Sequence, residues 1–180
     1  MIQTRRLTLR RWRESDRAVF AAINVEPETA YWLGGQITRA QSDRAIDRYS
    51  AHIEAHGFGR WAVERLEDGA LIGAIGVMPV IGDYAFEGFE LGWRLARQTW
   101  GQGFATEAAR AALVDAFARG GLTEIIAFTS DQNLRSIGVM QRIGMVRDAA
   151  RDFDHPALAP DHPLLRHMVY AATRASITTA

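Results

Sequence analysis

The sequence predicts one α/β domain in which strands and helices mix along the whole chain. Segments with apolar residues two apart, typical of strands, alternate with segments whose apolar residues recur at helical spacing. No linker, repeat or low-complexity stretch divides the 180 residues. At this length, with 48% hydrophobic residues, the chain can bury one core but hardly two, so we expect a single domain over residues 1–180.

The N-terminal part predicts one strand and two helices. Residues 5–12 alternate and predict a strand with an arginine-rich face. A first helix is expected over residues 14–24. Thr38 and Gln41 have the spacing of a capping box, and a glycine follows the apolar face, so residues 38–56 predict a second helix.

The middle of the chain predicts three strands and a long helix. Asp68-Gly69 between apolar runs is a strong hairpin signal and separates the second strand from the third. Residues 86–96 predict a fourth strand. A helix follows over residues 103–119, and a glycine pair ends it.

The C-terminal part predicts a fifth strand over residues 123–130 and a short helix, capped by Asn133, that runs to Ile143. Residues 145–153 and 164–174 supply the last two strands, around a loop rich in proline and histidine. The predicted order is βααβββαβαββ, with about seven strands and about four helices.

Composition excludes several classes of protein. Lys plus Arg (21) balances Asp plus Glu (21), so no global charge recruits nucleic acid or an acidic membrane. Without cysteine there is no disulfide framework, no thiol nucleophile and no thiolate metal site. No signal peptide and no apolar run of membrane-spanning length is recognisable. We expect a cytoplasmic protein with no nucleic-acid or membrane partner.

The segment between the fourth strand and the long helix carries the pattern Gln98-x-x-Gly101-x-Gly103. A P-loop is excluded because it requires a lysine, and this chain has none; a dinucleotide fingerprint requires a third glycine. Two readings remain open from spacing alone. The glycines either form a plain strand-to-helix turn or let an anion approach the N–H groups of the first helical turn.

The wider pattern resembles a known family. The blocks "ELGWRLARQTWGQGFATEA" and "NLRSIGVMQRIGM" resemble the two most characteristic blocks of the GNAT superfamily of N-acetyltransferases, in its Rim-type branch, which acetylates ribosomal-protein N-termini. The resemblance implies a mixed, mostly antiparallel sheet that splays between its fourth and fifth strands. It also implies acetyl-CoA as cosubstrate, with the pantetheine arm in the gap and the pyrophosphate on the glycine segment.

Site residues follow from the same resemblance. The segment from Trp93 to Leu95 is expected beside the pantetheine and acetyl group, and Asn133 is expected to bind the pantetheine amides, although Asn is also a common helix cap. Glu107 is expected to point away from the bound anion. The expected cofactor-binding residues are Trp93, Arg94, Leu95, Gln98, Gly101, Gln102, Gly103, Phe104, Ala105, Thr106, Asn133 and Ser136.

The expected chemistry is direct attack of an unprotonated amine on the thioester. Ser136 is the candidate that protonates the departing thiolate, and Glu90, on the fourth strand, is the candidate base. Asp152 and Asp154 are weaker candidates. Arg142 is a candidate contact for a coenzyme phosphate.

Two further segments are candidates for the substrate mouth. His155, His162 and His167 lie among prolines without the spacing of a helical zinc pair, so we expect no metal, and one histidine is a candidate proton acceptor. Residues 31–33 are read first as core packing and second as a wall of the mouth.

The predicted function is therefore acetyl transfer to an amine, on a peptide or protein N-terminus or on a small molecule, by a monomer or homodimer. The alternative is a coenzyme A-binding sensor or interaction module without turnover.

Overall fold

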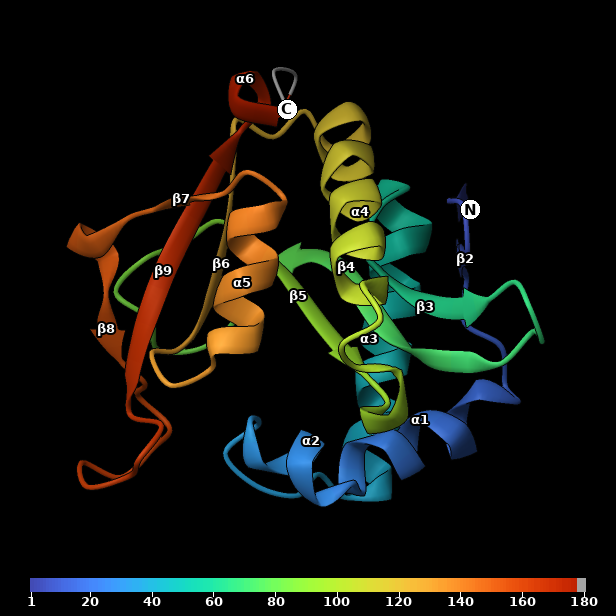
Figure 1. Cartoon of the computed structure of the whole chain (residues 1–180), viewed down its shortest axis with the longest axis horizontal. Helices are drawn as coiled ribbons and strands as arrows, with labels where there is room; N and C mark the ends of the chain where they lie inside the picture. Colours follow the sequence, from blue (N-terminus) through green and yellow to red (C-terminus); the bar gives the residue numbers. More distant parts are fainter. Residues whose placement is uncertain (178–180) are drawn as a thin grey trace.

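The computed structural model describes residues 1–177, which form a mixed sheet covered by helices on both faces (Figure 1). The strands are β1 (Ile2–Gln3), β2 (Leu7–Arg10), β3 (Arg60–Arg65), β4 (Leu71–Pro79), β5 (Phe89–Leu95), β6 (Glu124–Ser130), β7 (Val146–Arg147), β8 (Phe153–Asp154) and β9 (Arg166–Thr173). The helices are α1 (Asp16–Val25), α2 (Pro27–Tyr31), α3 (Arg39–His56), α4 (Phe104–Gly120), α5 (Leu134–Arg142) and α6 (Arg174–Ile177), with 3₁₀ turns η1 (Arg97–Thr99) and η2 (Ala149–Arg151).

The strands follow the order β1-β2-β3-β4-β5-β6-β9-β7, and β8 also pairs with β9. All pairs are antiparallel except β5 with β6, which are parallel. This is the predicted mixed, mostly antiparallel sheet. The fourth and fifth predicted strands are β5 and β6.

The prediction differs from the structure in its short elements. β1 was not predicted, because two residues are too few to show an alternation. The strand predicted over residues 145–153 is wrong as one element, because the turn η2 divides it into the two-residue strands β7 and β8. The helix α2 has five residues and begins with Pro27, and α6 has four. Within the described residues the count is thus nine strands and six α-helices rather than seven and four.

The first predicted strand is shorter than expected, and its arginine-rich face is not left to solvent. All four residues of β2 are buried. Arg10 donates hydrogen bonds to Asp16 at 2.7 and 2.9 Å and to Glu64 at 2.6 Å. Alternation alone could not reveal these partners, because they come from α1 and from β3.

Helix ends agree with their sequence signals. Thr38 and Gln41 form the predicted capping box at the start of α3. Gly57 follows α3, and Gly121 follows α4, each with the positive φ that glycine adopts readily. Among the described residues, no helix combines the length and apolarity that a bilayer crossing requires.

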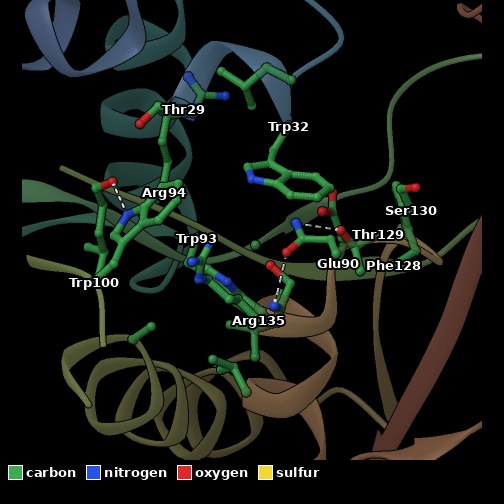
Figure 2. A pocket seen from close by; sticks show the side chains of 18 of the residues that line it. Thr29, Trp32, Glu90, Trp93, Arg94, Trp100, Phe128, Thr129, Ser130 and Arg135 are labelled. Carbon is green, nitrogen blue, oxygen red and sulfur yellow. Dashed lines mark hydrogen bonds between the residues drawn. The ribbon is translucent and has the colours of Figure 1, made fainter. Parts of the chain in front are cut away.

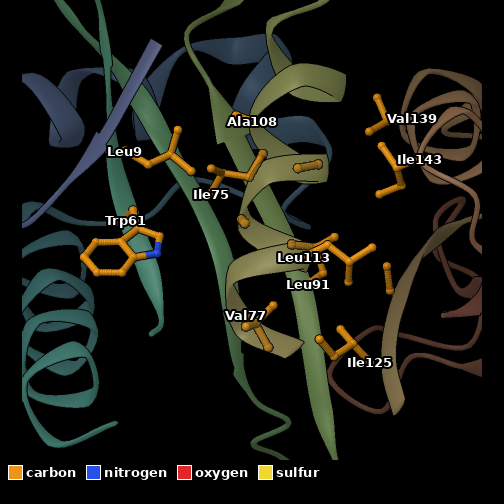
Figure 3. Close-up of a cluster of buried hydrophobic side chains, with 14 of the residues drawn as sticks. Leu9, Trp61, Ile75, Val77, Leu91, Ala108, Leu113, Ile125, Val139 and Ile143 are labelled. Carbon is orange, nitrogen blue, oxygen red and sulfur yellow. The ribbon is translucent and has the colours of Figure 1, made fainter. Parts of the chain in front are cut away.

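The main core lies between the sheet and the helices α4 and α5, which cover one of its faces (Figure 3). Ile75, Val77 and Leu91 of the sheet pack against Leu113 of α4. Four alanines of α4 are also buried there, and their small size lets the helix lie close to the strands: Ala108, Ala109, Ala112 and Ala116.

The opposite face of the sheet is covered by α1 and α3. Phe20 and Tyr49 pack there against Ala74 and Met78 of β4. The two faces therefore carry different elements, and the site described below opens toward both.

Candidate active site

The site lies where β5 and β6 separate. Glu90 and Ile126 are the one pair in register between these strands, which diverge toward their C-terminal ends (Figure 1). A cavity of about 670 Å³ fills the region beyond that pair. Residues from η1 and α4, from α5, from the segment after α2 and from residues 155–167 complete its walls. The expected splay is thus present between the predicted fourth and fifth strands.

The glycine segment forms one wall. Gly101 and Gly103 have φ of 77° and 82°, a region that L side chains rarely adopt, and Gly103 is the N-cap of α4. No side chain caps this helix, so its first N–H groups have no side-chain partner, and Phe104, Ala105 and Thr106 of that first turn line the cavity. The Phe104 side chain itself is buried in the core.

Space is not the main reason for these glycines. A Cβ at Gly101 would meet nothing within 4 Å, and a Cβ at Gly103 would lie 3.4 Å from the flexible end of Arg6. Without a bound ligand, the positive φ of the backbone is the reason for glycine at both positions. Gln98 and Gln102 do not line the cavity; the Gln102 side chain donates to the Gln98 carbonyl at 2.9 Å.

Glu107 is directed away from the cavity, as expected, but it does not face open solvent. It accepts hydrogen bonds from the Thr4 hydroxyl at 2.7 Å and from the Arg6 backbone and side chain at 2.8 and 2.7 Å. Burial alone would raise the pKa of Glu107, but these hydrogen bonds outweigh it, and the pKa is lowered. The negative charge of Glu107, in the first turn of α4, is therefore hydrogen-bonded to the N-terminal segment of the chain.

Asn133 and Ser136 both line the cavity at the start of α5. Asn133 accepts a hydrogen bond from the Ser136 backbone N–H at 3.2 Å and donates one to the Thr129 hydroxyl at 3.1 Å. Asn133 thus acts as the helix cap, the second of its two expected roles. These two contacts use one lone pair of its side-chain carbonyl and one amide hydrogen, which leaves the side chain a second lone pair and a second amide hydrogen.

Cationic side chains surround the same end of the cavity. Arg135 and Arg142, both on α5, line it. The guanidinium groups of Arg97 and Arg135 lie 5.1 and 5.5 Å from the ring centre of Trp100. Together with the free N-terminus of α4, they make this end suited to phosphate groups.

The opposite end of the cavity lies on the face of β5 that α1 and α3 cover. Glu90 and Arg94 line it there (Figure 2). Arg60 of β3 also lines it, with its Nη2 4.0 Å from the Glu90 carboxylate. Sequence reasoning missed Arg60, because the residue lies thirty positions from Glu90 and only the pairing of β3, β4 and β5 brings the two together.

Residues 31–33 are not core, which corrects the first expectation for that segment. Tyr31 is 47% exposed and Leu33 is 37% exposed. Trp32 and Leu33 line the cavity, and Trp32 extends into it on the side of Glu90 and Thr129 (Figure 2). The second expectation, a wall of the mouth, is the one that the structure supports.

Two of the three histidines reach the cavity. His155 and His167 line it with ring centres 4.9 Å apart, and the Tyr84 hydroxyl lies 3.1 Å from His155 Nε2. Burial lowers the pKa of both histidines, which keeps them neutral at neutral pH. Tyr84 was not predicted; it lies in the loop before β5, without a local pattern.

The remaining candidates lie elsewhere. His162 is outside the cavity lining, and its Nδ1 accepts a hydrogen bond from the Leu164 N–H at 3.1 Å. Asp152 is paired with Arg147, and Asp154 lies 3.3 Å from Arg166; neither lines the cavity, so neither is placed to act as a base. Within residues 1–177, no three histidine or acidic side chains gather as a metal site would require.

A mixed sheet that splays beside a glycine-rich helix start defines the acetyltransferase class of fold. The chain belongs to the GNAT acetyltransferase family, since the model of the acetyltransferase (GNAT) domain matches residues 6–146.

The chain is also similar to individual proteins and solved structures. The uncharacterised protein YkkB of Bacillus subtilis is 28% identical over 143 residues, which cover 79% of this chain and 83% of YkkB. The crystal structure of an acetyltransferase from Agrobacterium tumefaciens superposes with a TM-score of 0.76 at 27% identity, over 96% of this chain and 94% of that one. RimJ of Mycobacterium smegmatis, solved in complex with CoA-disulfide, superposes with a TM-score of 0.69 at 20% identity, over 94% and 82% of the two chains.

Proposed function

We propose that this protein is an acetyl-CoA-dependent N-acetyltransferase that transfers the acetyl group directly to an amine, on a peptide N-terminus or a small molecule. The observation that carries the proposal is the cavity in the β5–β6 splay, which joins an uncapped helix N-terminus on one side to ionisable groups on the other. We treat residues 1–180 as one such domain, acting in the cytoplasm as a monomer or homodimer.

The residues at the α4 and α5 end fit coenzyme A. The N–H groups of the first turn of α4, next to Gly101 and Gly103, would bind the pyrophosphate, and Arg135 and Arg142, which line the same end, would add positive charge. Asn133 and the backbone from Trp93 to Leu95 would bind the pantetheine arm. Acetyl-CoA would supply the acetyl group as a thioester, activated toward attack by an amine.

The chain's own groups have three tasks in this proposal. Glu90 is the candidate that removes the amine proton, and the neutral His155 is a second candidate because it lines the same cavity with a lowered pKa. A backbone N–H of β5 is the candidate that polarises the acetyl carbonyl. Ser136 is the candidate that returns a proton to the departing thiolate.

The Rim-type branch is part of the proposal, and the two sequence blocks that resemble it are its support. The similarity to RimJ, at 20% identity, supports the fold and leaves the acceptor to experiment.

The test is release of free thiol from acetyl-CoA in the presence of a panel of amines, with the product identified by mass. The expected result is an N-acetylated amine and one thiol per product. Tight binding of coenzyme A with no acetylation of any amine would instead support the sensor or interaction module without turnover. Ser136→Ala should lower kcat in the same assay.

A further inference from the structure

Two largely buried arginines lie at the end of the cavity opposite the α4 N-terminus, called here the acceptor end, and one carboxylate faces both of them. Arg60 and Arg94 both line it, and the side chain of Arg60 is 16% exposed. The Nε and Nη2 of Arg60 and the Nε of Arg94 are shielded from solvent and make no hydrogen bond within the described residues. Buried guanidinium nitrogens are costly to leave unpaired, so each calls for an explanation.

The backbone of β5 arranges these groups in a row. Glu90, Gly92 and Arg94 are two apart and share one face. Arg60 extends across the sheet so that a Cβ on Gly92 would lie 2.1 Å from its Nη2. The missing side chain at Gly92 therefore makes room for the Arg60 guanidinium between Glu90 and Arg94.

Neighbouring elements fix the two guanidiniums without neutralising them. Arg94 donates from Nη1 to the Asn24 carbonyl oxygen at 2.6 Å, and the Asn24 amide donates to the Ser42 hydroxyl at 2.8 Å, which sets its orientation. The Arg60 guanidinium lies 5.5 Å from the ring centre of Tyr49 on α3. Asn24 and Ser42 are neutral, and among residues 1–177 the carboxylate that lies nearest to Arg60 is that of Glu90, at 4.0 Å.

The charge count at this end of the cavity is two cations against one anion. Burial lowers the pKa of Arg94 to about 10, so it is still cationic at neutral pH. Burial would raise the pKa of Tyr49, but the charges of Arg60, Arg94 and Arg48 outweigh it and the pKa is lowered. The electrostatic potential at this end of the cavity is therefore positive, which disfavours binding of a polycationic acceptor.

Resting on the proposed function, we propose that the acceptor is an amine that also carries a carboxylate, and that Arg94 and Arg60 bind this carboxylate. A guanidinium presents a planar fork of donors that matches a carboxylate, and a carboxylate would satisfy nitrogens that the protein leaves unpaired. The acceptor amine then lies toward Glu90 and the backbone of Trp93, on the same strand. Arg60 and Arg94 thus select the acceptor.

The first experiment compares acceptors with the wild-type protein. Free α-amino acids, their carboxamides, peptides with an N-terminal Asp or Glu, and polyamines are each offered with acetyl-CoA. The carboxamides have the less basic amine and would react faster if the arginines played no part. We expect the carboxylate-bearing acceptors to have kcat/KM at least about tenfold higher than the carboxamides, as expected for a charge-assisted, bidentate contact. The free amino acids and the acidic peptides distinguish an α-carboxylate from a side-chain carboxylate.

Variants assign the preference to the arginines. Arg94→Met should raise KM for the carboxylate acceptor by about tenfold to a hundredfold and so remove most of its advantage over the carboxamide. Arg94→Lys, which keeps the charge and loses the fork, should be intermediate. Arg39→Gln changes an exposed arginine that pairs with Asp43 on α3, and it should leave both acceptors unchanged.

A binding measurement separates this proposal from the proposed function. With coenzyme A present, the free amino acid should raise the midpoint of thermal unfolding of the wild type, whereas the carboxamide should leave it unchanged. In Arg94→Met, both compounds should leave the midpoint unchanged. This readout does not need turnover, so it tests the anion site even if no amine is acetylated. Equal or faster reaction of carboxamides or polyamines, or a carboxylate preference that persists in Arg94→Met, would overturn the inference.

Discussion

The N-terminus of α4 offers a sharp test, because a glycine with the same backbone requirement lies at each end of that helix. Gly103 precedes α4 with φ of 82°, and Gly121 follows it with φ of 61°. Only Gly103 lines the cavity beside the β5–β6 splay. Substituting alanine at each position therefore applies the same backbone perturbation with and without the proposed pyrophosphate site.

The effect on stability can be estimated from the backbone. An L residue in the left-handed region costs about 1–2 kcal/mol. A Cβ at Gly121 would meet nothing within 4 Å, and a Cβ at Gly103 would meet only the flexible end of Arg6 at 3.4 Å, so neither adds a steric cost. Gly103→Ala and Gly121→Ala should each lower the free energy of unfolding by about 1–2 kcal/mol.

The effect on binding should differ between the two variants. A Cβ at Gly103, or a shift of the first helical turn to relieve its strain, disturbs the N–H groups proposed to hold the pyrophosphate. One lost charge-assisted hydrogen bond costs about 1.5–3 kcal/mol, or roughly tenfold to a hundredfold in the Kd of acetyl-CoA. Gly121→Ala should leave this Kd unchanged, because Gly121 is at the far end of a 17-residue helix.

The assay is calorimetric titration with acetyl-CoA, paired with chemical denaturation of each variant. An unchanged Kd in Gly103→Ala, at the expected loss of stability, would show that the pyrophosphate is bound elsewhere. Equal weakening in both variants would show that general destabilisation, and not the local site, controls binding.

Three further predictions concern catalysis and acid stability. Ser136→Ala should lower kcat more than it changes the Kd of acetyl-CoA, since the sulfur needs a proton only as charge develops on it during the reaction. Steady-state turnover and a binding titration on the same variant test this, and an unchanged kcat would assign the proton to water. Glu90→Gln should lower kcat/KM only about tenfold for an α-amine, because the pKa of that amine, near 8, leaves it partly unprotonated at neutral pH. The pH dependence of the rate should therefore follow the titration of the amine itself. Faster acetylation of an N-blocked peptide with one lysine than of a peptide with a free N-terminus would contradict this. Burial would raise the pKa of Asp16, but hydrogen bonds from Arg10 and the Arg13 backbone outweigh it, and the pKa is lowered. The stabilising contribution of ionised Asp16 is therefore fully present above its pKa in the unfolded chain, near 3.9, and is lost as pH falls through its lower pKa in the folded protein. Asp16→Asn weakens the hydrogen bonds to Arg10 but leaves Glu64 as its counter-charge, so it should cost about 1.5–3 kcal/mol at neutral pH. It should also flatten the acid limb of the denaturation curve, and an acid limb as steep as in the wild type would assign that limb to other carboxylates.

The sequence by itself determined the elements with strong local signals. The capping box at Thr38, the hairpin at Asp68-Gly69 and the Asn133 cap each depend on residues within a few positions of one another, so their geometry follows from local hydrogen bonds and backbone preferences. The long helix and the strands around it follow from apolar spacing in the same way. Family resemblance then extended these local signals to the splay and to the glycine segment.

Only the tertiary structure decided which distant side chains share the cavity. Arg60 and Arg94 line one cavity because Arg60 pairs with Gly76 and Gly76 with Gly92, and because the missing side chain at Gly92 leaves room for the Arg60 guanidinium. Trp32 lines the same cavity from the segment after α2, although its neighbourhood in the sequence favoured core packing. The physical reason is that burial and electrostatic pairing depend on sheet register and on the packing of helices onto the sheet, which join residues tens of positions apart, whereas periodicity and capping report only on a residue's immediate neighbours.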